Sequence, residues 1–491
     1  MNRAGNDLAI VIIGSGFAGL CMAIRLKQAG FDDFAILEQD ADLGGTWRDN
    51  QYPGCACDVP SHMYSFSFEL NPGWSAMFAP QREIWDYMRR CAAKYGVTAH
   101  IRFGRAVERM EWDDASGRWH IATATGEAYT ARAIVSGIGA LHVPSIPQIP
   151  GADRFAGTAF HSARWQRSCD LAGKRVAVIG TGASAIQFVP QIAKHAARVH
   201  VFQRTPPWIH PRPDFPIPPA VRAVFCAAPP TMRVVRDGIY WLLEARAVGF
   251  AVPLGHARLM APLQRVAQRH IERQIDDPGL RAKVTPDYTI GCKRILLSSD
   301  YYPALARPNV DLVTEPVTQI TESGLACADG STYDADVIIY GTGFRTVEAV
   351  GELRVAGRDG VKLRDVWRGG VEAYHGITVP GFPNFFLLLG PNTGLGHNSV
   401  VFMIESQVQH VLSCLRLMAR QGGRAIEVKE PALRRFNDAV QRRLRRAVWS
   451  EGGCTSWYLD AHGVNRALWP GFSFEYWART RRARRRDYMV R

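Results

Sequence analysis

The sequence lacks the features that mark secreted, membrane-spanning and zinc-binding proteins. Its ten cysteines are spaced singly, apart from Cys55 and Cys57, and form no dense disulfide framework. The first residues lead straight into an expected strand, without the apolar core and cleavage site of a secretory signal. The most apolar internal region, 239–263, is interrupted by charged residues and proline. No histidine and cysteine residues have zinc-ligand spacing, so we expect no metal. From the cysteine pattern we expect a cytoplasmic protein, and from the interrupted apolar region we expect no membrane span.

Acidic residues are outnumbered by basic ones. Asp and Glu total 45, Lys and Arg total 59, and the formal net charge is +14. Part of the excess lies in the C-terminal run 478–491. Such a run can attract nucleic acid or anionic lipid, but a solvated tail is the simpler interpretation, and we expect no nucleic-acid partner. A basic surface also suits the capture of a dinucleotide that carries an extra phosphate.

The length of the chain excludes a single hydrophobic core. Cores stop growing at a few hundred residues, so 491 residues predict two or more domains. Apolar residues make up 47% and charged residues 21% of the chain, a balance typical of folded globular proteins.

A dinucleotide-binding unit is predicted at the start of the chain. The apolar run 7–13 ends in a glycine turn, continues into a helical pattern, and is followed by a second strand that ends at Glu38. Gly14 makes the turn, Gly16 lets backbone approach a pyrophosphate, and Gly19 allows the helix to pack closely. Glu38 lies where such units place an acceptor for ribose hydroxyls. The helix N-terminus favours the phosphate charge.

The same unit recurs from residue 174, with one informative difference. Its second strand ends in Arg204 and Thr205, in place of an acid. An arginine can pair with a phosphate on the adenosine ribose and a threonine can donate a hydrogen bond, so this unit predicts a preference for NADPH over NADH. The residues expected to bind this dinucleotide are Gly180, Thr181, Gly182, Ser184, Arg204 and Thr205.

The segment 44–58, GGTWRDNQYPGCACD, resembles the flavin-side signature of type I Baeyer-Villiger monooxygenases and of related flavin monooxygenases. In this resemblance Asp58 is the acid beside the flavin ring. The further residues that it implies contact FAD are Gly45, Thr46, Trp47 and Tyr64.

The linker FAGTAFHSARW matches the family hallmark at Phe155, Gly157, His161 and Trp165. Related enzymes that oxidise amines and sulfides usually have a smaller residue in place of the tryptophan. Gln166 departs from the proline or aspartate of the family pattern, which leaves the subfamily and the substrate open. We interpret the histidine as a residue that positions the linker.

Two further matches lie far along the chain. In GCKRILLSSDYY the resemblance assigns Lys293 to the NADPH phosphate and Arg294 to catalysis, with NADPH contacts of its own. In CTSWYLD it places Trp457 in a mobile segment that closes over the nicotinamide. Residues 209–286 lie outside the resemblance and are interpreted as a helical insertion.

The resemblance implies an FAD-dependent monooxygenase that consumes NADPH and O2 and converts ketones or aldehydes to esters or lactones through a flavin peroxide. Arg294 would stabilise the negative charge on the peroxide, and Asp58 would orient the guanidinium. The alternative within the superfamily is oxygenation of sulfur or nitrogen. A pyridine-nucleotide disulfide reductase shares the architecture, but Trp47 stands where that class has a redox cysteine pair. Cys55 and Cys57 have the wrong spacing and are interpreted as packing thiols.

The expected fold is α/β with two Rossmann-like dinucleotide-binding domains, of which the FAD domain is discontinuous. Its two parts are 1–145 and 331–491, the second with a mobile segment and a basic tail, and the NADPH domain is 146–330. The apolar strand 337–340 is expected to return the chain to the first unit, and the glycine-rich loop 390–396 to lie near the flavin. The specific carbonyl substrate and the oligomeric state stay open.

Overall fold

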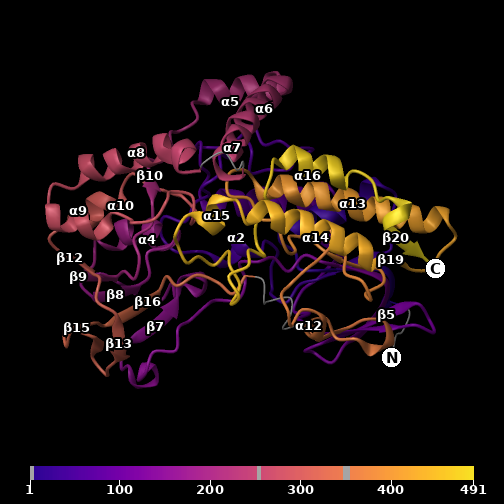
Figure 1. Ribbon diagram of the computed structural model, residues 1–491, viewed down its shortest axis with the longest axis horizontal. Coiled ribbons are helices and arrows are strands. Elements are labelled where there is room, and N and C mark those ends of the chain that lie inside the picture. Colours follow the sequence, from indigo (N-terminus) through magenta and orange to yellow (C-terminus); the bar gives the residue numbers. More distant parts are fainter. Residues whose placement is uncertain (1–4, 252–255, 347–353) are drawn as a thin grey trace.

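The computed structural model describes residues 5–251, 256–346 and 354–491 of the chain. Figure 1 shows two sheet regions that lie apart along the long axis, with the N- and C-termini near the first sheet and a helical layer that runs across both. Each region contains parallel strands connected through helices, and the first also contains three consecutive antiparallel strands, so the predicted α/β class with two dinucleotide-binding units is confirmed.

The first sheet has eight strands and takes them from both halves of the chain. Strand β1 (Asp7–Ile13) lies between β6 (Ala128–Ser136) and β2 (Phe34–Leu37) and pairs in parallel with both. Helix α1 (Phe17–Gln28) packs on β1 and β2. The apolar run that ends in the first glycine turn is therefore the buried centre of this sheet. In spatial order the strands are β17 (Arg354–Ala356), β4 (Val107–Asp113), β5 (Arg118–Thr123), β6 (Ala128–Ser136), β1 (Asp7–Ile13), β2 (Phe34–Leu37) and β3 (Ile101–Arg102), with β18 (Phe385–Leu387) also paired to β6.

The second sheet has five parallel strands and carries the repeated unit. Their order is β12 (Val310–Val313), β9 (Arg198–Phe202), β8 (Arg175–Ile179), β16 (Val337–Tyr340) and β7 (Thr158–His161), and helix α4 is Ala185–Ile192. The expectation that the strand 337–340 returns to the first unit is wrong, because β16 pairs with β7 and β8. Both units contain an apolar strand that ends in a glycine turn, so the local pattern does not decide which sheet receives it.

Three small sheets complete the strands. They pair β10 (Ile209–His210) with β11 (Leu296–Leu297), join β13 (Val317–Ile320), β14 (Gly324–Cys327) and β15 (Thr332–Asp334), and pair β19 (Ile426–Val428) with β20 (Tyr488–Val490). The last pair corrects the interpretation of the C-terminus as a solvated tail. The arginines between 481 and 486 are exposed, but Tyr488 is buried and the chain ends in a paired strand.

The region 209–286 is helical, as predicted for the insertion, and it projects from the molecule at α5 and α6 (Figure 1). None of the described helices is long and apolar enough to cross a membrane. The helices not yet given bounds are α2 (Thr46–Asp49), α3 (Gln81–Lys94), α5 (Pro219–Ala227), α6 (Pro229–Ala245), α7 (Ala247–Ala251), α8 (His256–Gln274), α9 (Pro278–Val284), α10 (Tyr301–Leu305), α12 (Leu363–Val366), α13 (Val400–Arg420), α14 (Glu430–Leu444), α15 (Val448–Glu451) and α16 (Ser473–Thr480).

Candidate active site

The first glycine turn has the shape that a pyrophosphate requires. Gly14 has φ +87°, and a Cβ on Gly19 would lie 1.9 Å from the carbonyl oxygen of Gly14, so only glycine fits there. Gly16 caps α1 without a side-chain hydrogen bond, and the first turn of the helix contains no acid. The free N–H groups and the helix dipole therefore favour an anion at this end of α1.

The predicted flavin-side segment lies against this turn. Gly45 precedes α2 at φ +51°, and a Cβ on it would lie 3.3 Å from Cα of Gly16. Thr46 and Trp47 form the first turn of α2, and the indole Nε1 of Trp47 donates to the Tyr64 hydroxyl at 3.1 Å. The structure thus brings together the two segments that the sequence assigned separately to FAD.

Glu38 is buried and already bonded through both carboxylate oxygens. One oxygen accepts from the backbone N–H and the hydroxyl of Ser15, at 2.8 and 2.5 Å. The other accepts from Arg48 at 3.2 Å and from the N–H of Asp40 at 3.1 Å. These four contacts fill the acceptor capacity of the carboxylate, so a ribose hydroxyl reaches Glu38 only if one donor moves.

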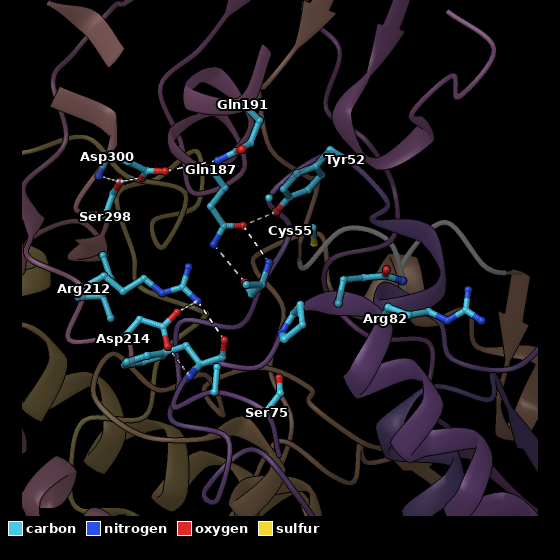
Figure 2. A pocket seen from close by; sticks show the side chains of 17 residues that line it. Tyr52, Cys55, Ser75, Arg82, Gln187, Gln191, Arg212, Asp214, Ser298 and Asp300 are labelled. Carbon is cyan, nitrogen blue, oxygen red and sulfur yellow. Dashed lines mark hydrogen bonds and ion pairs between the residues drawn. The ribbon is translucent and has the colours of Figure 1, made fainter. Parts of the chain in front are cut away.

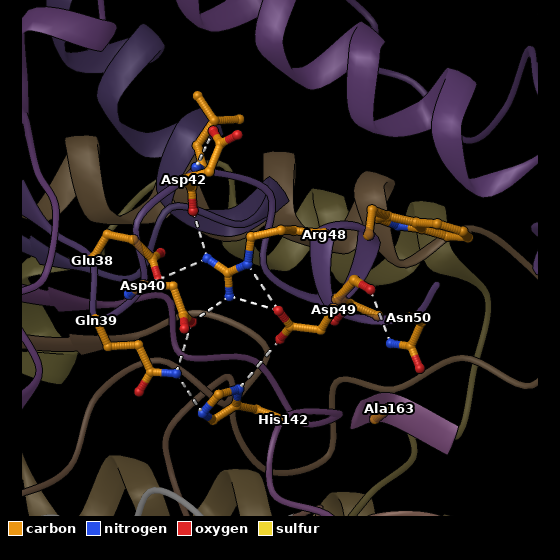
Figure 3. A network of polar contacts seen from close by, with 12 residues as sticks. Glu38, Gln39, Asp40, Asp42, Arg48, Asp49, Asn50, His142 and Ala163 are labelled. Carbon is orange, nitrogen blue, oxygen red and sulfur yellow. Dashed lines mark hydrogen bonds and ion pairs between the residues drawn. The ribbon is translucent and has the colours of Figure 1, made fainter. Parts of the chain in front are cut away.

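Sequence reasoning missed Arg48, which lies at the centre of this network (Figure 3). Its guanidinium forms ion pairs with three carboxylates. The partners are Glu38, Asp40 at a short distance, and Asp49 at 2.7 Å. A cation within a segment rich in acids was the available signal. Arg48 ties the end of β2 to α2 and so holds the segment that contains Trp47.

The second glycine turn packs against a third one. Gly180 has φ +106°, and a Cβ there would lie 2.5 Å from the carbonyl oxygen of Gly341, which follows β16; Gly182 lies in the same turn. Thr181 is buried, with its hydroxyl 3.5 Å from the carbonyl oxygen of Thr205. Ser184 caps α4 without a side-chain cap bond, and the N–H groups of Ile186 and Gln187 in the first turn donate to the backbone carbonyls of Gly182 and Ser184.

Two cations meet near the end of β9. Arg204 is exposed and Lys293 is half-buried, and burial followed by the charge of Arg204 lowers the pKa of the lysine. The ammonium lies 4.9 Å from the centre of the Tyr288 ring. In the described part of the chain neither cation has a carboxylate within ion-pair distance. An unpaired pair of cations suits a phosphate.

Asp58 and Arg294 form an ion pair that joins distant parts of the chain, as predicted. Oδ2 of Asp58 accepts from Nε of Arg294 at 2.8 Å and from Nη2 at 2.6 Å. The charge of Asp58 raises the pKa of the guanidinium. The side chain of Arg294 is 32% exposed and that of Asp58 is 26% exposed, so the pair can still contact reactants.

The segment after α15 approaches this pair. Tyr458 is buried and interacts electrostatically with Arg294, and burial raises the pKa of its phenol to about 12. The ring of Trp457 is tilted by 55° against that of Tyr458, with ring centres 4.5 Å apart, and Trp457 is 51% exposed. The arrangement therefore directs the tyrosine, and not the predicted tryptophan, toward the ion pair.

A disulfide that the sequence did not indicate joins the segment that contains Lys293 and Arg294 to the segment after α15. Cys292, next to Lys293, is bonded to Cys454, with a separation of 162 residues and 6.1 Å between Cα atoms. No local spacing signals such a pairing. Cys55 and Cys57 are buried and free, which confirms their interpretation as packing thiols.

The linker between the sheets is fixed by packing. Nδ1 of His161 accepts from the N–H of Ala163 at 3.1 Å, and burial lowers the pKa of the imidazole to about 4, so the ring is neutral. This geometry confirms the positioning interpretation of His161. Trp165 packs between Phe160 and Phe188 of α4, at ring distances of 5.2 and 5.4 Å. Its volume locks the linker onto the second unit.

Gln187 of α4 was also missed, and it clamps the segment before Asp58. Its amide oxygen accepts from the Tyr52 hydroxyl at 3.0 Å and from the N–H of Ala56 at 3.3 Å, while its nitrogen donates to the Ala56 carbonyl at 3.1 Å. Figure 2 shows these contacts at the wall of a cavity of about 520 Å³. Asp58 and Arg294 do not line this cavity, so it is separate from the ion pair.

The loop 390–396 packs away from these turns in its described contacts. Gly390 lies against the carbonyl of Gly376, and Gly394 pairs with the segment at Leu468. Its predicted closeness to the flavin stays a prediction.

Comparison with known proteins adds to this geometry. Residues 11–228 match the family described as pyridine nucleotide-disulphide oxidoreductase, which is less than half of the chain. A Baeyer-Villiger monooxygenase of Pseudomonas aeruginosa is 51% identical over 479 residues, or 97% of this chain and 90% of the relative. A Baeyer-Villiger monooxygenase of Streptomyces coelicolor is 48% identical and covers 98% of this chain and 92% of the relative.

Solved structures give the same result. A steroid monooxygenase bound to NADP has a TM-score of 0.87 and 29% identity, with 99% of each chain covered. A closed structure of cyclohexanone monooxygenase has a TM-score of 0.86 and 26% identity, also with 99% of each chain covered. A structure named OTEMO, in complex with FAD and NADP, has a TM-score of 0.86 and covers 96% of this chain. The likeness therefore extends over both sheets and the segments between them.

Proposed function

Because this chain belongs to the Baeyer-Villiger monooxygenases, we propose that Asp58 and Arg294 form its reacting centre. The protein is an FAD- and NADPH-dependent oxidoreductase that converts ketones or aldehydes to esters or lactones. The relatives support this activity and not oxygenation of sulfur or nitrogen. The observation that carries the proposal is the ion pair between an acid of the flavin-side segment and an arginine of the second unit.

The N-terminus of α1 and the two glycine turns, at Gly14 and Gly180, fit the two dinucleotides. When bound, NADPH supplies hydride and FAD supplies oxygen activation, which side chains do not provide. The residues proposed to hold FAD are Gly14, Gly16, Gly19, Glu38, Gly45, Thr46, Trp47, Asp58 and Tyr64. The residues proposed to hold NADPH are Gly180, Thr181, Gly182, Ser184, Arg204, Thr205, Lys293, Arg294 and Trp457.

Arg294 acts as a fixed hydrogen-bond donor. A guanidinium stays protonated at any working pH, and the charge of Asp58 raises its pKa further. Its partly accessible nitrogens can donate to the carbonyl oxygen of the substrate and to negative charge that develops during the reaction. The same group cannot accept a proton, so it serves as an electrostatic stabiliser and not as a base.

Asp58 sets the direction of that donor. Both of its contacts use one oxygen, Oδ2, and converge on the Nε and Nη2 side of the guanidinium. Among the described residues Nη1 has no hydrogen-bond or ion-pair partner, so it is left for the reactants. Gln187 supports this geometry, because it ties Ala56 to α4 and thereby fixes the segment that ends at Asp58.

The sheet assignment supports a division into two nucleotide domains. We place 1–145 in the FAD domain and the chain from 146 in the NADPH domain, which the sequence predicted to end at 330, with the insertion at about 209–286. The boundary at 331 moves to the end of β16, because that strand pairs within the second sheet. The remaining chain to 491 then completes the FAD domain, which gains β17 and β18 from it.

A reducing compartment suits most of the cysteines. Eight thiols are free, and several of them are buried, which is usual for proteins kept in the cytoplasm. We therefore place the protein there, with a small carbonyl compound and O2 as its partners. Thiol labelling in intact cells compared with lysed cells tests the location, and labelling of exposed Cys226 by an impermeant reagent in intact cells would contradict it.

The activity is tested by aerobic NADPH oxidation with the FAD-loaded protein. The panel contains linear, cyclic, aryl and steroidal ketones together with a thioether, and products are identified by mass spectrometry. We expect an ester or lactone that has gained one oxygen atom. Sulfoxide as the sole oxygenated product would contradict the proposed carbonyl chemistry and favour heteroatom oxygenation.

A further inference from the structure

Helix α6 exposes several large apolar side chains and buries two charged ones. Val234, Trp241 and Leu242 are 72%, 60% and 63% exposed. In contrast, Arg236 and Glu244 of the same helix are buried. A surface helix ordinarily has the opposite distribution, with its apolar stripe on the core.

The buried charges of α6 are fully engaged, so the orientation of the helix is fixed. Arg236 donates to the carbonyl oxygen of His62 and, at 3.1 Å, to the hydroxyl of Ser65. Glu244 accepts from His397 at 3.1 Å and from Asn398 at 2.9 Å. A rotation that buried the apolar side would break these bonds and leave charges unpaired inside the protein. The apolar face is therefore held outward by the fold.

The exposed face continues onto α16. The ring of Trp241 lies 5.9 Å from that of Phe474, and Trp477 is one helical turn further along α16. Phe474 and Trp477 are 40% and 42% exposed. We refer to Val234, Trp241, Leu242, Phe474 and Trp477 as the apolar patch. Contiguous exposed groups of this kind mark interaction sites, whereas single exposed apolar residues do not.

Positive charge adjoins the apolar patch. The guanidinium of Arg481 lies 4.7 Å from the centre of the Trp477 ring, and the arginines 482, 484, 485 and 486 that follow are exposed. Two charges of opposite sign, Arg233 and Asp237, flank the exposed side of α6 and offset each other. The surroundings of the patch are therefore basic.

We propose that the apolar patch docks the protein on an anionic lipid surface, without a membrane-spanning segment. Exposed tryptophans together with leucine and valine suit the boundary between headgroups and acyl chains, and the neighbouring arginines attract anionic headgroups. The helices α5 and α6 project from the molecule (Figure 1), and the contact between Trp241 and Phe474 places the patch where α6 meets α16.

A second copy of the chain suits the same surface less well. A symmetric contact through the patch would bring the two arginine clusters toward each other, and each chain has a formal net charge of +14. Like charges at the rim of an interface oppose association, whereas an anionic bilayer neutralises them.

Vesicle sedimentation with the FAD-loaded protein tests the proposal. The vesicles are phosphatidylcholine alone or phosphatidylcholine with about one third phosphatidylglycerol. We expect binding to the anionic vesicles that weakens with salt. Trp241→Glu combined with Leu242→Glu should lower the partition coefficient by about tenfold or more, and Arg481→Glu should lower it less. The control is Val366→Glu on α12, which adds one carboxylate, half the charge of the patch variant, at a residue 45% exposed outside the patch.

Three results would overturn the proposal. Wild-type protein that stays unbound with anionic vesicles excludes lipid docking. Equal binding by the patch variant and Val366→Glu shows that another surface is responsible. A dimer in sedimentation velocity that the patch variant converts to a monomer, without vesicle binding, assigns the patch to a second copy of the chain. The flavin absorbance spectrum and ketone-dependent NADPH oxidation verify that each variant is folded.

Discussion

The two dinucleotide units have the same local pattern but opposite environments at the end of the second strand. After β2, Glu38 is buried and bonded to Ser15, Asp40 and Arg48. After β9, Arg204 is exposed, and its nearest functional neighbour is a second cation, Lys293. The carboxylate at the first end is bonded to groups of the protein itself, whereas the two cations at the second end have no ion-pair partner among the described residues and suit a phosphate. Equivalent positions in a repeated unit thus acquire different energetics.

The difference indicates how the two cofactors would be held. A satisfied network favours a cofactor that stays bound while the protein reacts, since it keeps the loop and α2 in one arrangement. Unpaired cations at the surface favour a dinucleotide that binds and leaves, since they attract a phosphate at little structural cost. Asp58 belongs to the first environment and Arg294 to the second, so the ion pair joins the two.

Arg294→Ala is expected to have the largest effect, because it removes the contact between the two environments. Ester formation should fall by about 10² to 10³-fold, the usual loss when a preorganised donor is deleted. Turnover is measured by product mass spectrometry, with the flavin spectrum as evidence of bound FAD. Arg294→Lys is the matched control, because it keeps the charge but not the planar fork, and we expect it to restore part of the rate. Normal ester formation by Arg294→Ala would disprove the assignment.

Loss of the Cys292–Cys454 disulfide is expected to have the second-largest effect, a decrease in the free energy of unfolding. A bridge across 162 residues restricts the unfolded chain, so Cys292→Ser should lower the free energy of unfolding by about 3 kcal/mol. Urea unfolding without reductant measures this loss, and Cys226→Ser at an exposed free thiol is the control. A reductant should bring the wild type to the value of Cys292→Ser. A wild type insensitive to reductant would contradict the prediction.

Glu38→Gln tests the buried hydrogen-bond network that follows β2. The change keeps the shape of the side chain but removes a charge that faces buried Arg48, so we expect a loss of about 2 kcal/mol in the free energy of unfolding and weaker FAD retention. Both are measured by urea unfolding and by flavin release on dilution. Glu108→Gln on β4 is the control, since Glu108 is exposed and has no ion pair within the described chain. Equal stability of the two variants would show that the network is dispensable.

Arg204→Ala tests the open end and should have the smallest effect. The KM for NADPH should rise about tenfold, while that for NADH changes little, because only NADPH has the phosphate that we propose the guanidinium binds. Steady-state kinetics with both dinucleotides give the ratio, and NADH serves as the internal control. An equal rise in the KM for NADPH and the KM for NADH would assign Arg204 a structural role and not a role in phosphate recognition.

Residues close together in the sequence were sufficient to predict the main helices and strands of the two dinucleotide units. Glycine turns, buried strands and amphipathic helices depend on residues close in sequence, so the strands at 7–13 and 337–340 and the two dinucleotide units follow from pattern alone. The family resemblance supplied Asp58 and Arg294, and the structure confirms their contact but not their roles.

Tertiary structure decided everything that depends on which distant segments meet. It placed β16 in the second sheet, joined Cys292 to Cys454, filled the acceptors of Glu38 and turned the apolar face of α6 outward. Each outcome rests on contacts between residues that are many positions apart. The sequence specifies the shape of each segment through short-range sterics and hydrogen bonding, whereas long-range pairing is set by the packing of the whole chain.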